Sequence, residues 1–228
     1  MTDWTASDLE IVRLSLKVAT VGTVASLPFA IAAAVLLARG RFWGRGLLNA
    51  LVHLPLVLPP VVTGYLLLRL FGRRGVVGAL LESALGFTFA FRWTGAALAA
   101  AVMGFPLMVR AIRLAIEGVD RRLEETAATL GANPWWTMIA VTLPLALPGV
   151  LSGMVVAFAK ALGEFGATIT FVSNIPGETQ TLALAIYSLT QAPGGDAHAW
   201  RLVWLSLGVS VAALLVSEAL ARRIERRR

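Results

Sequence analysis

The chain of 228 residues is 57% hydrophobic and only 14% charged, whereas about 25% of the residues in a soluble domain are charged. This composition excludes an ordinary soluble fold. The net charge of +7 does not indicate nucleic-acid binding, because the arginines lie at the ends of apolar runs and form no stripe; the lack of cysteine excludes a thiol catalyst and a Cys-based metal site.

Five uncharged runs are long enough to form membrane-spanning helices, which need about 20 mostly apolar residues. Two weaker segments, 76–89 and 179–191, are expected to form interfacial or re-entrant helices. Because apolar runs extend along the whole chain, we predict one all-α domain, residues 1–228, that forms a polytopic helix bundle with about five transmembrane helices; a sixth span is the alternative. The five runs lie between Lys17 and Arg39, between Arg45 and Arg69, between Arg92 and Arg110, within 126–159, and between Arg201 and Glu218.

The distribution of arginine predicts how the chain lies in the membrane. Basic residues near span ends are retained on the cytoplasmic side, and the strongest cluster is the tail ARRIERRR at residues 221–228. Arg73 and Arg74 fall on the other side and are exceptions to this bias. The first residues are acidic and polar, unlike a signal peptide, so the first apolar run should remain in the mature protein. We expect a multi-pass protein of the cytoplasmic (inner) membrane, with its N-terminus outside and its C-terminus in the cytoplasm.

A polar segment, residues 120–144, separates the third and fourth spans. Residues 120–130 have helical composition, and Gly131 supplies the positive φ that a helix C-terminal cap needs. The residue before Pro134 favours an extended conformation, so a helix, a sharp turn and a second helix should follow in order. Small side chains and the carboxylates of Glu124 and Glu125 would be exposed there, which is typical of an element on which another protein docks.

This segment is similar to the cytoplasmic coupling loop of ABC importer permeases, whose pattern is EAA, three residues, G, nine residues and IxLP. The pattern begins here at Glu125 and ends at Pro144, with Thr126 in place of the first Ala and Val141 in place of Ile. The resemblance implies that the loop fits a cleft of a separate ATPase subunit and carries its closure into the membrane. The coupling residues that it indicates are Glu124, Glu125, Thr126, Ala127, Gly131, Ala132, Leu143 and Pro144.

Three further segments, 53–68, 105–120 and 162–181, resemble the molybdate permeases of that family, with sulfate/thiosulfate or tungstate permeases as alternatives. Five spans are few to enclose a path, so we expect a second copy of the chain, and the resemblance also implies a homodimer, two cytoplasmic ATPase subunits and an external substrate-binding protein. The sequence has no GxxxxGK[ST] motif for nucleotide phosphates, so ATP and Mg are expected on the ATPase. For this chain itself we expect a lipid environment and no catalytic residue, metal, cofactor or nucleic acid.

Few polar groups fall within the predicted spans, and these are candidates for the translocation pathway or its gate. Lys160 and Glu164 are four residues apart on one helix face and could form an ion pair. Thr168 and Thr170 could donate hydrogen bonds to a passing oxyanion. The alternatives are an ion pair at the outer interface and hydroxyl groups that bond to carbonyls of the preceding helical turn.

Two other classes of function are weighed against the importer. A secondary carrier would work without an ATPase, and the coupling pattern argues against it. A membrane enzyme would need converging catalytic groups, but the sequence has no HExxH and no Ser/His/Asp pattern. His53, beside the prolines of the second run, is interpreted as a hydrogen-bonded packing residue.

Overall fold

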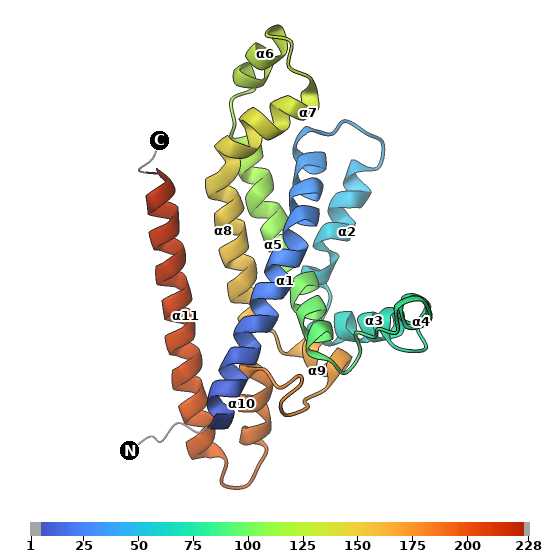
Figure 1. Ribbon diagram of the computed structural model, residues 1–228, viewed down its shortest axis with the longest axis vertical. Coiled ribbons are helices and arrows are strands. Elements are labelled where there is room, and N and C mark those ends of the chain that lie inside the picture. The colour runs from blue at the N-terminus through green and yellow to red at the C-terminus, as the bar shows by residue number, and fades with distance from the viewer. Residues whose placement is uncertain (1–5, 226–228) are drawn as a thin grey trace.

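Three long helices form the centre of the protein: α1 (Ala6–Arg39), α5 (Trp93–Glu117) and α8 (Leu143–Leu162) (Figure 1). The computed structural model describes residues 6–225, without the side chains at 214 and 216–225. All regular elements in this part are helical, which confirms the predicted fold class. The other elements are α2 (Arg45–Val57), α3 (Pro60–Phe71), α4 (Val76–Leu85), α6 (Arg121–Thr129), α7 (Pro134–Thr137), the π-helical turn η1 (Met138–Thr142), α9 (Gly166–Val172), α10 (Leu182–Thr190) and α11 (Asp196–Glu225).

Small side chains let the three central helices approach one another closely. Ala30 and Ala34 of α1 are fully buried in a cluster with Met108 of α5 and with residues of α8. A Cβ atom placed on Gly22 of α1 would lie 2.7 Å from the carbonyl oxygen of Ala97 on α5. Lipid tails are as apolar as these side chains, so helices in a membrane associate through such close van der Waals packing.

Within residues 6–225, three helical segments are long and apolar enough to cross a membrane: α1, α5, and the run Pro134–Leu162 that ends with α8. They correspond to the first, third and fourth predicted spans. The second predicted span is divided into α2 and α3, between which the chain bends by 114°, so this segment is a broken span or a re-entrant loop. Consecutive Pro59 and Pro60 explain the break, since proline disfavours a helical conformation in the residue before it; Leu58 is accordingly extended.

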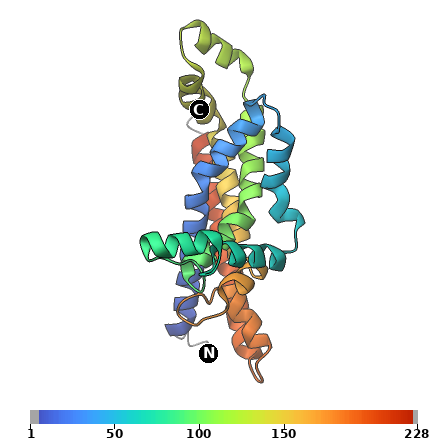
Figure 2. The ribbon, with the colours of Figure 1, turned by 90° about the vertical axis from the view of Figure 1, so that its right-hand side faces the viewer.

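The bend turns α3 away from the bundle, nearly perpendicular to the central helices (Figures 1 and 2). There α3 packs against α9, another short helix that follows a break in the chain. The two backbones are close at Gly64, where a Cβ atom would lie 2.5 Å from the carbonyl oxygen of Ala167. The predicted weak segments form α4 and α10, which are short helices as expected.

The first residues of α1 and the last residues of α11 lie at opposite ends of the bundle (Figure 1). At the end where α1 starts, Asp8 is fully buried and pairs with Nε2 of His198 on α11, at 2.7 Å. Ser15 accepts a hydrogen bond from the backbone N–H of Leu182, which attaches α10 to α1. The fifth predicted span lies within α11; the arginine side chains of the tail that set the predicted orientation lie outside the described residues.

Candidate functional site

The segment from α6 to α7 forms the predicted helix, turn and second helix. Asp120 caps the start of α6, because its side chain accepts a hydrogen bond from the N–H of Arg122 at 3.0 Å. Gly131 follows α6 with φ +87°, the left-handed conformation that the sequence predicts there. Asn133 is extended and its side chain accepts a hydrogen bond from the N–H of Trp136 at 2.7 Å, which caps α7. These local contacts confirm the predicted helix boundaries.

This element projects beyond the ends of the central helices (Figures 1 and 2). None of the nine residues of α6, all of which the structure describes, is buried. Beyond α6, Leu130 is 84% exposed and Trp135 is 74% exposed. Large exposed apolar side chains on a projecting element indicate a protein or membrane contact. Of the predicted coupling residues, Glu125, Thr126, Gly131 and Pro144 are exposed, and Ala127, Ala132 and Leu143 are partly buried.

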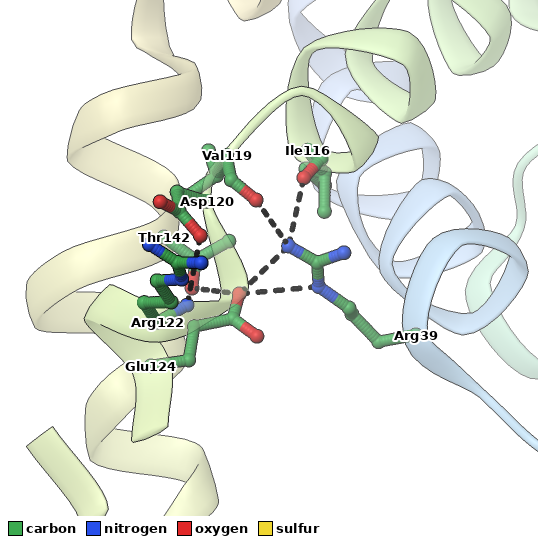
Figure 3. Close-up of polar contacts among 7 residues, drawn as sticks. All are labelled: Arg39, Ile116, Val119, Asp120, Arg122, Glu124 and Thr142. Carbon is green, nitrogen blue, oxygen red and sulfur yellow. Dashed lines mark hydrogen bonds and ion pairs between the residues drawn. The ribbon is translucent and has the colours of Figure 1, made fainter. Parts of the chain in front are cut away.

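Glu124 is turned toward the bundle, unlike its exposed neighbour Glu125. Its Oε1 atom accepts hydrogen bonds from Nε and Nη2 of Arg39, at 3.1 and 2.9 Å, and from the hydroxyl of Thr142, at 2.8 Å (Figure 3). Nη2 of Arg39 also donates to the carbonyl oxygens of Ile116 and Val119, at 2.9 and 3.2 Å. The side chains of Arg39, Glu124 and Thr142 therefore connect α6 with η1 and with the C-terminal ends of α1 and α5. We call this set of contacts the Arg39–Glu124 network.

The backbone of η1 explains how Thr142 reaches this network. Pro144 has no N–H and cannot donate to the carbonyl four residues earlier, and the chain makes a π-helical turn before it, with the N–H of Leu143 bonded to the carbonyl of Met138. Such single wide turns are frequent at functional sites. Thr142 is fully buried, and its hydroxyl faces Glu124 (Figure 3). The proline of the sequence pattern thus coincides with a local change in helix geometry.

A cleft of about 500 Å³ lies between α6, η1 and the C-terminal end of α1. Its lining includes Arg39, Arg41, Arg121, Glu124 and Glu125. Arginine side chains such as those of Arg41 and Arg121, which are not part of the Arg39–Glu124 network, are suited to bidentate contacts with carboxylates of a partner protein. Among the described residues, no group of three or more His, Cys, Asp or Glu side chains is gathered that could hold a metal ion.

The four predicted pathway residues lie elsewhere: Lys160 near the end of α8, Glu164 in the break after α8 and not on the same helix as predicted, and Thr168 and Thr170 in α9. The expected ion pair is present: Nζ of Lys160 lies 2.6 Å from Oε2 of Glu164. Glu164 is 3% exposed, and its Oε1 accepts a hydrogen bond from the N–H of Ala167 at 3.0 Å. Thr170 donates to the carbonyl oxygen of Gly166 at 2.9 Å, as the alternative interpretation predicts. Thr168 is buried.

Sequence reasoning missed two members of the Arg39–Glu124 network. Arg39 was interpreted only as a basic residue at a span end, and Thr142 only as the variable position of the motif. Arg39 and Glu124 are 85 residues apart, so no local pattern links them. Nδ1 of His53 donates a hydrogen bond to the carbonyl oxygen of Asn49 at 2.8 Å, in line with its interpretation as a packing residue.

Comparisons with known proteins agree with this architecture. Residues 11–228 match the family model described as binding-protein-dependent transport system inner membrane component. The molybdenum transport system permease protein ModB of Escherichia coli (strain K12) is 58% identical over 218 residues, which cover 96% of this chain and 95% of that protein. The sulfate transport system permease protein CysW of Synechococcus elongatus is 40% identical over 177 residues, 78% of this chain and 62% of that protein.

A similar fold occurs in the crystal structure of a bacterial alginate ABC transporter in complex with its alginate-bound periplasmic protein. The TM-score is 0.77 at 18% identity, with 96% of this chain and 80% of that chain covered. At this identity the likeness concerns the fold alone, whereas the family match covers nearly the whole sequence. The chain therefore belongs to the family of inner-membrane components of binding-protein-dependent transport systems.

Proposed function

We propose that this chain is the membrane-spanning subunit of an ATP-driven importer that carries molybdate across the cytoplasmic membrane. The observation that carries the proposal is the projecting α6–α7 element: its left-handed turn at Gly131 and the π-helical turn before Pro144 fall at the glycine and the proline of the coupling pattern. The identity of 58% to a molybdenum permease over nearly the full length supports molybdate as the substrate.

The proposed assembly contains two copies of this chain, two ATPase subunits and an external substrate-binding protein. ATP and Mg bind to the ATPase subunits, and this chain is a permease without enzymatic activity of its own. The ATPase faces the α6 end, where Arg39, Arg41, Arg45 and Arg121 lie, because arginine near span ends marks the cytoplasmic side. The N-terminus is then external and the C-terminus cytoplasmic, and the binding protein docks at the end that contains α10.

Sulfate is the main alternative substrate, since sulfate and molybdate are both tetrahedral dianions and a sulfate permease is 40% identical to part of this chain. An ATP-independent carrier would not need the α6–α7 element. Altering that element should therefore lower uptake by an importer and leave uptake by a carrier unchanged.

The test of ATPase coupling combines Glu125→Ala with Gly131→Ala. This double variant removes an exposed carboxylate and strains a turn at φ +87°, so we expect molybdate uptake per ATP hydrolysed to fall about ten-fold. Uptake and hydrolysis are measured in vesicles that contain both subunits and the binding protein.

The matched control is Glu82→Ala with Gly46→Ala. Glu82 lies on α4, and a Cβ atom at Gly46 would have no neighbour within 4 Å. The control should keep the ratio of the unsubstituted protein. An unchanged ratio in the Glu125 and Gly131 double variant would contradict the proposed function.

A further inference from the structure

The geometry points to different roles for two adjacent carboxylates, Glu124 and Glu125, an inference that rests on the proposed function. Glu125 faces the ATPase, whereas Glu124 is a positioning residue that never contacts it and instead fixes α6 to the membrane helices. Arg39 and Thr142 are the partners through which Glu124 acts. The Arg39–Glu124 network is therefore the joint that passes movement of the ATPase into the bundle.

Packing alone does not hold α6 against the bundle. None of its nine residues, all described by the structure, is buried, and Leu123, its large apolar residue, is 47% exposed. The caps formed by Asp120 and Asn133 are contacts to their own helices and set no orientation toward the membrane helices. Glu124 is the side chain of α6 that forms hydrogen bonds to α1 and η1, through Arg39 and Thr142.

The geometry of the network suits a rigid joint. One carboxylate oxygen of Glu124 receives three hydrogen bonds from two segments that are distant in the sequence. The side chains of Arg39 and Glu124 are only 15% and 21% exposed, and hydrogen bonds between charged groups are shorter and stronger than neutral ones. Arg39 is also bonded to the carbonyl of Ile116 in the last turn of α5 and to that of Val119 just after it, so a rotation of α6 would pull on the ends of α1 and α5.

Thr142 gives the network its connection to the third central helix. It lies in η1, directly before α8, and is fully buried. Its hydroxyl donates to the oxygen that also accepts from Arg39. A displacement of α6 by the ATPase would therefore reach α1, α5 and α8 together.

The experiment compares Glu124→Ala with Glu125→Ala in the complete transporter. Two quantities are measured for each: the amount of ATPase that copurifies with the permease, and molybdate uptake per ATP hydrolysed. We expect Glu124→Ala to retain the ATPase and lower the uptake ratio about ten-fold. Glu125→Ala should lower copurification. Glu124→Gln keeps an acceptor oxygen without the charge and should give an intermediate ratio.

Variants of Thr142 distinguish the effect of its hydroxyl from the effect of its side-chain volume. They test the Arg39–Glu124 network even if the Glu124→Ala variant does not fold. Thr142→Val keeps the shape and removes the donor, so the uptake ratio should fall about three-fold; Thr142→Ser keeps the donor and should stay near the ratio of the unsubstituted protein. Arg39→Gln combined with Glu124→Ala should be no worse than the more harmful single change, because both break one network.

Three results would overturn the inference while leaving the proposed function in place. These are loss of ATPase from the Glu124→Ala variant, an unchanged uptake ratio in that variant, and equal ratios for Thr142→Val and Thr142→Ser. Failure of the unsubstituted protein to take up molybdate with ATP would instead contradict the proposed function, and with it the inference.

Discussion

Lys160 and Glu164 show how this chain accommodates a charged pair in an apolar bundle. Glu164 is almost fully buried, and its two oxygens have separate partners: Lys160 on α8 and the N–H of Ala167 at the start of α9. Buried charges in membrane segments are costly unless paired, and they often mark a pathway. The contacts give the pair a structural role at the break between α8 and α9, and a gating role stays a prediction.

Replacing Lys160 by methionine tests both roles. It leaves the Glu164 carboxylate with one fewer hydrogen bond, a loss of about 2 kcal/mol of stability, so the detergent-solubilised protein should unfold at a lower temperature. Glu164→Gln should cost less, because the glutamine is neutral and leaves no unpaired charge on the buried side chain. Thermal unfolding and molybdate uptake are measured together. Normal uptake by the Lys160→Met variant would remove the gating role, and an unchanged unfolding temperature would remove the structural one.

At the scale of elements, local signals in the sequence were read correctly where a single residue decides the backbone. Gly131 predicts the end of α6, and the residue before Pro134 is extended as expected. Pro59 and Pro60 carry an equally local signal, yet the uncharged run from Arg45 to Arg69 was interpreted as one span. The length of an apolar run shows that a segment can be buried in lipid, but it does not show that the helix is continuous. Backbone groups at a break can bond to neighbouring helices, and the sequence alone does not reveal which helices are neighbours.

The candidate site was also predictable only in part from the sequence. Spacing from Glu125 to Pro144 was sufficient to locate the coupling element. The inward direction of Glu124 was not predictable, because it depends on Arg39 at the end of α1 and on the wide turn that orients Thr142. Such contacts follow from how α1, α5 and α8 pack, which the small residues at their crossings determine.

The crossing of α1 and α5 at Gly22 should therefore be sensitive to size. Gly22→Leu places a side chain where a Cβ atom alone would lie 2.7 Å from the carbonyl oxygen of Ala97, and overpacking of this kind costs about 1–3 kcal/mol. We expect less folded protein in the membrane and a lower unfolding temperature. Gly208→Leu is the control, since a Cβ atom there would have no neighbour within 4 Å. Equal behaviour of the two variants would contradict close α1–α5 packing.

At the scale of the whole molecule, the two ends of the bundle differ in a way that suits directional transport. One end carries the projecting α6–α7 element, the cleft between α6, η1 and α1, and the Arg39–Glu124 network. The other end joins the first turns of α1 and α11 through Asp8 and His198, with α10 beside them. A subunit of an importer must contact an ATPase at one end and a substrate-binding protein at the other, and the proposed orientation assigns these partners to the two ends.

The central claim is ATP-driven import of molybdate, and uptake of radioactive molybdate into proteoliposomes tests it most directly. The proteoliposomes contain this chain and its ATPase, with the binding protein outside and ATP or a non-hydrolysable analogue inside. The account predicts accumulation of molybdate only with hydrolysable ATP, with little competition from excess sulfate. Equal molybdate uptake with the analogue, or preferential uptake of sulfate, would contradict it.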